Sequence, residues 1–178
     1  MSATPFIKEI LTMPNPIDSL KAKTAGAAKS VKARVEGLSG VFNTLAKQHA
    51  EAKSLLENLQ NNPDKKADLW PEIRKALLSH ERGELRAVYP VLARYAELQQ
   101  LTARHNAEAE QLEALIDRIE TNVDWRAPFD QLVSTVIAHA QEEETSIFPR
   151  ALQVIGKESA KDLDTYFLTA QKRIKEAV

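Results

Sequence analysis

The feature of this sequence that most limits its fold is a motif that occurs twice with the same internal spacing. Both copies read His-x3-Glu-x4-aromatic-Pro, and the second follows the first by 59 residues. Residues four apart lie on one face of an α-helix, about 6 Å apart along its axis. Each copy therefore predicts a helix that presents one histidine and one glutamate to the same site. The copies comprise His80, Glu84, Tyr89 and Pro90, and His139, Glu143, Phe148 and Pro149.

The other two histidines of the chain, His49 and His105, correspond to each other at an offset of 56 residues. Each is followed by small and acidic residues and then by leucines. The chain is therefore predicted to consist of two tandem helical hairpins, each with one lone histidine and one His-x3-Glu pair. Measured from the expected turns, the histidines reach similar depths, so all four are predicted to lie in one layer of a bundle.

Helical periodicity supports this organisation, because apolar residues recur three or four positions apart and only five glycines occur in the chain. The fold class is predicted to be all-α, an antiparallel up-down four-helix bundle followed by a C-terminal helix. Ser39 is expected to cap the first helix. The expected helices run from Ser39 to Asn61, from about Asp68 to Tyr89-Pro90, from about Glu97 to Glu120, from about Arg126 to Pro149, and from Gly156 onward.

Residues 1–38 are expected to form a weakly helical N-terminal arm, separate from the bundle domain at residues 39–178. The arm is rich in basic residues and has only a weak apolar stripe. One interpretation is a segment that packs on the bundle or stays loose. The other is a basic amphipathic segment that docks on a partner or a membrane surface.

Composition excludes several classes of protein. The chain contains no cysteine, which removes disulfides, thiolate nucleophiles, iron–sulfur clusters and Cys-type zinc sites. The net charge of −1 gives no indication of a nucleic-acid partner. Neither a signal peptide nor a membrane-spanning segment is expected, so a cytoplasmic location is the default prediction.

The clustered donors indicate a metal site, since imidazole and carboxylate ligands without sulfur suit iron, manganese or zinc. A single His-x3-Glu pair is more often a solvated pair on a helix surface. Two copies with matching tails, joined by two further histidines in register, favour the metal site over that interpretation.

These motifs, over about residues 39–155, resemble the hemerythrin-like, or HHE cation-binding, family. The resemblance implies a four-helix bundle that holds two non-haem iron ions, bridged by carboxylates and by a solvent-derived oxo or hydroxo group. Glu84 and Glu143 would be the bridging carboxylates. The ferritin-like pattern fits poorly, because it uses Glu-x2-His on two helices and lone glutamates on the others. The implied ligands are His49, His80, Glu84, His105, His139 and Glu143.

One position departs from the oxygen-carrying members of that family, which have a second histidine four residues after the first on the third helix. Here that position is Ala109, and Glu81 or Glu108 is expected to complete the coordination instead. The first functional hypothesis is a di-iron protein that interacts with dioxygen, peroxide or nitric oxide, or that senses or buffers iron. The alternatives are a di-iron oxidoreductase that consumes peroxide or oxygen, and a metal-free helical interaction module.

Overall fold

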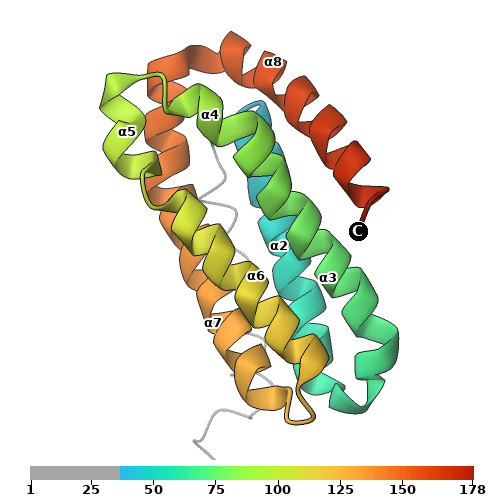
Figure 1. The fold of residues 1–178 in the computed structure, drawn as a ribbon. Helices are drawn as coiled ribbons and strands as arrows, with labels where there is room; N and C mark the ends of the chain where they lie inside the picture. The colour runs from blue at the N-terminus through green and yellow to red at the C-terminus, as the bar shows by residue number, and fades with distance from the viewer. Residues whose placement is uncertain (1–36) are drawn as a thin grey trace, which may run out of the picture. The chain divides into compact units, whose positions relative to one another are not determined.

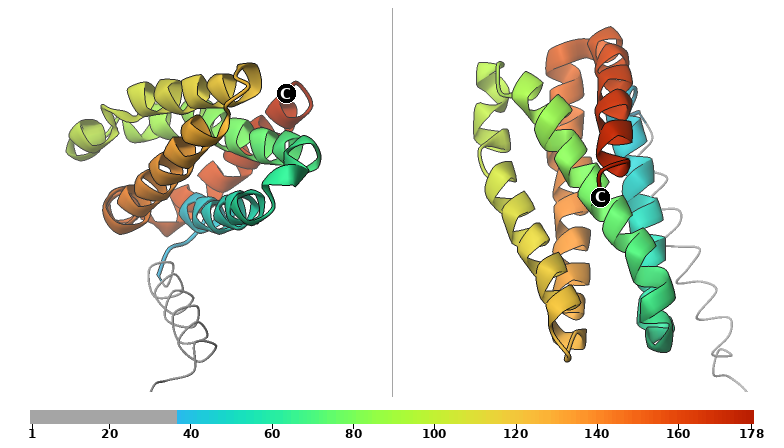
Figure 2. Two further views of the ribbon diagram at one scale, coloured as in Figure 1. Left: turned by 90° about the horizontal axis from the view of Figure 1, so that it is seen from below. Right: turned by 45° about the vertical axis from the view of Figure 1, so that its right-hand side comes forward.

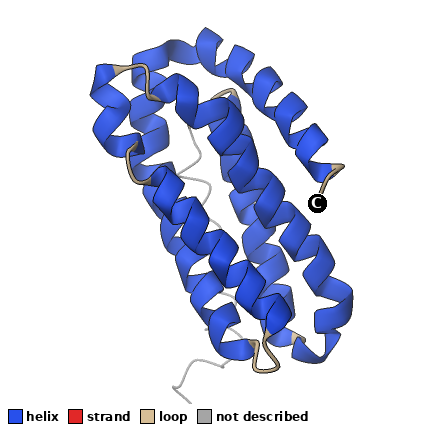
Figure 3. Ribbon diagram, in the orientation of Figure 1, coloured by secondary structure: helices blue, strands red, loops and turns tan. Residues whose placement is uncertain are grey.

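The computed structural model describes residues 37–178, and these residues are almost entirely helical (Figure 1, Figure 3). The chain divides into two units, Met1–Glu36 and Gly37–Val178. The predicted N-terminal arm, apart from its last two residues, lies outside the described residues. Within residues 37–178, no helix is long and apolar enough to cross a membrane.

Four helical segments form the bundle, and a further helix covers one side of it. Each segment comprises one or more consecutive helical elements. In chain order these elements are α2 Val41–Asn61, η3 Pro63–Lys65, α3 Lys66–Gly83, η4 Glu84–Val88, α4 Tyr89–Leu92, α5 Ala96–Thr102, α6 His105–Thr121, α7 Arg126–Glu142, η5 Glu143–Ile147 and α8 Phe148–Lys175.

The helices alternate in direction, with the α2–α3 turn and the α6–α7 turn at the same end of the bundle (Figure 1). The helix that begins as α7 continues through η5 into α8, and Gly156 interrupts it with a positive φ of 77°. After this glycine the chain turns back, and the last part of α8 packs against α2 and α3 (Figure 2). The predicted all-α four-helix bundle with a C-terminal helix is therefore confirmed.

The predicted end of the fourth helix at Pro149 is wrong, whereas the second helix ends within two residues of its predicted end at Tyr89-Pro90. The second helix continues to Leu92, and the fourth continues past Pro149. A proline lacks the N–H for an α-helical hydrogen bond, and its ring would meet the carbonyl four residues earlier. In both copies of the motif a five-residue π-helical segment, η4 or η5, comes directly before the aromatic residue and the proline. This wider turn accommodates the proline, so the helix continues.

Two further boundaries differ from the sequence prediction. The expected helix at 97–120 is divided into α5 and α6 by a turn at residues 103–104. The N-cap of α2 is Gly40 rather than Ser39, and no side chain caps that helix. Gly40 has a φ of 58°, and a Cβ atom there would lie 2.3 Å from the carbonyl carbon of Ala160 in α8. The close approach of α8 therefore requires glycine where the helix begins.

The apolar core is divided into two clusters along the bundle axis. One lies toward the end formed by α4, α5 and the beginning of α8, and it includes Phe42, Leu92 and Phe148. The other lies toward the end with the α2–α3 and α6–α7 turns, and it includes Leu59 and Phe129. Each histidine falls in the sequence between residues of the first cluster and residues of the second, although for His105, the first residue of α6, the first-cluster residue Leu98 lies on α5. A polar layer therefore separates the two halves of the core.

Candidate metal centre

The polar layer between the two core clusters contains all four histidines of the chain. His49 lies on α2, His80 on α3, His105 at the start of α6, and His139 on α7. Three of them are at most 7% exposed, and the side chain of His139 is 10% exposed. The structure thus brings the four histidines together in one layer, as the sequence predicts.

Seven side chains in this layer form two groups whose potential ligand atoms lie within 4.8 Å of one another in each group. The metal–ligand distance for nitrogen or oxygen is about 2.0–2.2 Å, so two ligands of one ion lie within about 4 Å of each other. The groups therefore have the dimensions of two neighbouring cation sites. The first consists of Glu81, Glu84, His105 and His139, and the second of His49, His80 and Glu143.

The two glutamates of the repeated motif lie between these groups. Oε2 of Glu143 is 3.1 Å from Nε2 of His49 and 3.5 Å from Nε2 of His139. Oε2 of Glu84 is 3.4 Å from Nε2 of His80 and 3.8 Å from Nε2 of His105. Each carboxylate thus contacts at least one histidine of each group. Both glutamates occupy the first residue of a π-helical segment and are completely buried.

Two histidines are oriented by side chains outside the groups. Nδ1 of His49 lies 3.0 Å from Oε1 of Glu144, and Nδ1 of His80 lies 3.0 Å from Oε1 of Gln48. Gln48 is itself held by a reciprocal amide pair with Gln171 of α8, at 2.8 and 3.1 Å. A carboxylate or amide oxygen that accepts the Nδ1 proton leaves the Nε2 lone pair free for a metal.

The Nε2 atoms of His49 and His80 face each other at 3.1 Å. With the Nδ1 protons directed outward, both Nε2 atoms present lone pairs, and two lone pairs at this distance repel. A cation between or beside them removes the repulsion, whether that cation is a proton or a metal ion. This pair therefore favours occupation by a cation.

His105 has a different environment. Its ring stacks on that of Tyr89 with the centroids 3.4 Å apart and the planes 7° apart. Neither ring nitrogen of His105 has a hydrogen-bond partner, although both are buried. The hydroxyl of the stacked Tyr89 donates a hydrogen bond to Oε1 of Glu143. Tyr89 thus both packs on a histidine and orients a carboxylate of the site.

The pKa values of the histidines diverge in the metal-free chain. Burial lowers the pKa of His49, but hydrogen bonds to Glu143 and Glu144 outweigh burial and raise that pKa to about 9. Burial, followed by the positive charge of His49, lowers the pKa of His80 well below its usual value. Burial also lowers the pKa of His105 to about 4. His49 therefore carries a proton at neutral pH, while His80 and His105 stay neutral.

The carboxyl groups diverge as well. Burial raises the pKa of Glu84 well above its usual value and that of Glu81 to about 7. Burial also acts to raise the pKa of Glu143, but the neighbouring His139 and His49 outweigh it and lower that pKa. Paired carboxyl groups with such different proton affinities need either shared protons or cations to be stable at neutral pH.

The unpaired polar atoms of the layer test whether these residues fit metal ions. Buried polar atoms almost always have a partner, because an unsatisfied one costs about 1–3 kcal/mol. Here many buried ligand atoms of the two groups have none, and they face one another. These residues therefore fit a pair of cations with mixed nitrogen and oxygen ligands. The atoms are Glu81 Oε2, both carboxylate oxygens of Glu84, both ring nitrogens of His105, His139 Nε2 and Glu143 Oε2.

Glu81 and Glu108, the two residues expected to complete the coordination in place of Ala109, differ in burial. Ala109 is 1% exposed on α6 and offers no ligand atom. The Glu81 residue is 3% exposed and belongs to the first group, whereas the Glu108 side chain is 33% exposed. The Oε2 atom of Glu108 lies 3.4 Å from Nδ1 of His139, which is the nitrogen on the far side of the ring from the groups. Glu81 thus belongs to a group that could hold a metal ion, and Glu108 lies outside both groups.

Sequence reasoning did not identify three residues of this site. Glu144 and Gln48 are sequence neighbours of the predicted ligands Glu143 and His49, so their proximity to the site could have been inferred from position alone. Gln171 lies in the C-terminal helix, 123 residues from its partner Gln48, and no sequence pattern connects them.

Comparison with known proteins agrees with this geometry. No match was found among curated proteins or among solved structures. The family model of the hemerythrin HHE cation-binding domain matches residues 40–151, which is more than half of the chain and contains every residue of the two groups. The chain therefore belongs to the hemerythrin HHE cation-binding domain family.

Proposed function

We propose that this chain holds two non-haem iron ions, bridged by Glu84 and Glu143, and uses them to react with dioxygen, peroxide or nitric oxide. The observation that carries the proposal is the position of these two carboxylates, each within 3.8 Å of a histidine from each group. A carboxylate between two sets of donors is suited to bridge two ions.

The remaining ligands divide between the two ions. His49 and His80 would hold one ion, and His105, His139 and Glu81 would hold the other. Seven donors exceed the four that a structural zinc ion takes, and a mixture of imidazole and carboxylate suits iron. Bound iron would supply the one-electron redox chemistry, and the chain supplies the ligands, their orientation and a largely buried site.

Glu81 bears on which reaction this chain favours. A carboxylate stabilises ferric iron more than a neutral imidazole does, because it adds a negative charge. With Glu81 at the site and Ala109 where oxygen carriers have histidine, oxidation is favoured over reversible oxygen carriage. We therefore infer that dioxygen, peroxide or nitric oxide oxidises the bound iron.

The test is anaerobic loading of metal-free protein with ferrous iron, followed by metal analysis and then by mixing with oxygen. We expect about two iron ions per chain and rapid, irreversible oxidation in air. Glu81→Gln should lower the iron content, whereas Glu108→Gln should leave it unchanged. One tightly bound zinc with no uptake of iron would contradict the di-iron assignment.

A di-iron oxidoreductase is a second candidate, and one observation favours it. A cavity of about 310 Å³ reaches His49, His80 and His139 from the surface between α2, α3 and α7. It is large enough for a small substrate. Mixing reduced protein with excess peroxide and a reductant distinguishes the two functions, because an enzyme would consume several equivalents of peroxide per chain.

A further inference from the structure

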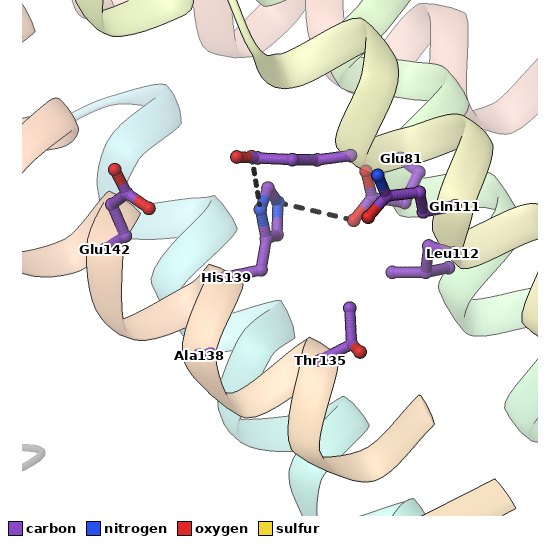
Figure 4. Close-up of a pocket in the computed structure, with 8 residues that line it drawn as sticks. Glu81, Gln111, Leu112, Thr135, Ala138, His139 and Glu142 are labelled. Carbon is purple, nitrogen blue, oxygen red and sulfur yellow. Dashed lines mark ion pairs between the residues drawn. The ribbon is translucent and has the colours of Figure 1, made fainter. Parts of the chain in front are cut away.

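A second cavity, of about 260 Å³, lies between α6 and α7 on another side of the centre (Figure 4). Its lining contains three carboxylates and one histidine: Glu142, Glu108, Glu81 and His139. Among the described residues that line it there is no lysine or arginine. Carboxylates therefore outnumber basic side chains in the lining, and two of them, Glu108 and Glu142, lie outside the ligand groups.

The carboxylates lie at increasing depth. The side chains of Glu142 and Glu108 are 44% and 33% exposed, whereas that of Glu81 is only 4% exposed. Oε2 of Glu81 is buried and has no hydrogen-bond partner. An unpaired carboxylate oxygen at the inner end of an acidic cavity attracts a cation.

His139 connects the outer and inner carboxylates. Its Nδ1 is 3.4 Å from Oε2 of Glu108, and its Nε2 is 3.5 Å from Oε1 of Glu81, as Figure 4 marks. The imidazole thus has one nitrogen toward the mouth and one toward the centre. An ion held by Glu108 would be one side chain away from the first ligand group.

Arg104 lies across the mouth. Its Nη2 donates a hydrogen bond of 2.6 Å to Oε1 of Glu142, and its Nε is 3.9 Å from Oε1 of Glu108. The arginine side chain is 68% exposed, so solvent screens these pairs and little free energy is needed to separate them. Arg104 is thus a counter-ion that an arriving cation can displace.

The cavity of about 310 Å³ also reaches Glu81, but its lining differs in charge, because Lys75 and Lys175 accompany the other two carboxylates, Glu51 and Glu72. Opposite charges there cancel, and a cation gains little from approaching that side. The two cavities therefore differ in how strongly they attract a cation.

We propose that the cavity between α6 and α7 is the route by which a divalent cation such as ferrous iron reaches the centre. Glu108 and Glu142 form a transient outer site, and Arg104 neutralises them until the ion arrives. This inference rests on the proposed function, since it requires a centre that takes up metal.

The test measures the rate at which the full-length, metal-free protein takes up cobalt(II), followed by its visible absorption after rapid mixing. Replacing both outer carboxylates, Glu108→Gln with Glu142→Gln, should slow second-order uptake about tenfold at low ionic strength, because a charged cleft raises on-rates by about 10–1000-fold. Added salt should reduce the difference. Arg104→Gln should accelerate uptake.

The matched control replaces the two carboxylates of the other cavity, Glu51→Gln with Glu72→Gln, and uptake should keep its original rate. The final number of ions bound should be the same in all variants. Equal uptake rates for the two double variants would overturn the proposed route. So would unchanged uptake with faster release from the Glu108 and Glu142 variant, since that result would make these residues ligands. Absence of bound cobalt at the end point, in the unaltered protein, would instead refute the metal site itself.

Discussion

At the scale of single residues, the centre depends on groups that hold the outer nitrogens of its histidines. Gln48 accepts the hydrogen bond from Nδ1 of His80 and is fixed by Gln171. Without this acceptor, the ring of His80 can rotate or place its proton on Nε2, which would block metal binding. The amide pair thus links α8 to a ligand on α3.

We therefore predict that Gln48→Leu weakens metal binding about 10–100-fold, the usual effect of removing such a partner. Gln48→Glu should bind more tightly than Gln48→Leu, because a carboxylate oxygen still accepts from His80. Competition titration with a chelator measures the affinity. Gln60→Leu, on the exposed side of the same helix, serves as control, and an equal loss in both leucine variants would contradict the prediction.

Metal uptake should also depend on pH. His49, with a pKa of about 9, carries a proton at pH 7 in the metal-free chain, and burial raises the pKa of Glu84, so that this carboxyl group holds its proton to a higher pH than an exposed glutamate does. Metal binding requires these groups to lose their protons, so uptake releases protons and weakens as the pH falls. Between pH 8 and pH 6 the apparent affinity should drop about tenfold per pH unit for each proton released. Calorimetric titration in buffers of different ionisation enthalpy counts these protons, and a pH-independent affinity would contradict the expectation.

The identity of the histidines and motif glutamates at the centre was predictable from the sequence, because their periodicity on helices is regular. The role of Glu81 could be offered only as an alternative to Glu108. Both residues lie beside a ligand or one turn from it, and spacing alone does not determine which one is buried. The structure separates them by burial, with Glu81 at 3% residue exposure and the Glu108 side chain at 33%.

At the scale of elements, the repeated motif specifies more than two ligands. Each copy places its glutamate at the start of a π-helical segment, where the backbone N–H five residues later bonds to the glutamate carbonyl. The spacing from the glutamate to the aromatic residue is the same in the two copies and matches this wide turn. Sequence reasoning treated each proline as a helix end, because proline usually breaks the α-helical pattern. It did not include the wider turn that accommodates proline, and this is why the fourth helix was wrongly predicted to end at Pro149.

The contact between α3 and α8 gives a prediction at this scale. A Cβ atom on Gly83 would lie 2.7 Å from Cε2 of Phe167, a fully buried side chain. Gly83→Ala should therefore destabilise the protein by about 1–3 kcal/mol through overpacking, although alanine favours a helix by about 1 kcal/mol. Urea unfolding measures the change.

The control is the same substitution beside a smaller side chain. In a Phe167→Leu protein, which has lost part of that ring, Gly83→Ala should be close to neutral or stabilising. An identical destabilisation in both proteins would show that the contact with Phe167 is not its cause.

At the scale of the whole molecule, a polar layer divides the core into two apolar clusters. The bundle and its helix order could be predicted from the hydrophobic periodicity and from the tandem repeat. The position of the last part of α8 did not, since an amphipathic helix does not itself specify which face of the bundle it covers. That helix buries Leu163 and Phe167 and reaches the centre through Gln171.

The same division of the core predicts how metal affects stability. In the metal-free chain the layer contains buried ligand atoms without partners, which oppose folding. Metal that binds only the folded chain stabilises it by mass action, by about 2.7 kcal/mol at a free concentration one hundred times the dissociation constant. For a chain of this size the melting temperature should rise by about 5–10 °C. Scanning calorimetry with ferrous iron under anaerobic conditions measures this rise.

The variants His80→Ala and His139→Ala each remove a ligand from a different group, and each should abolish most of the metal-dependent rise. Glu57→Gln alters an exposed side chain on α2, which pairs only with Lys53 at 3.8 Å among the described residues, so it should leave the rise intact. Because His80 and His139 lie on different helices, loss of the rise in both variants requires that metal joins α3 to α7. A rise of equal size in all three variants would mean that the ion binds elsewhere and that the polar layer is not its site.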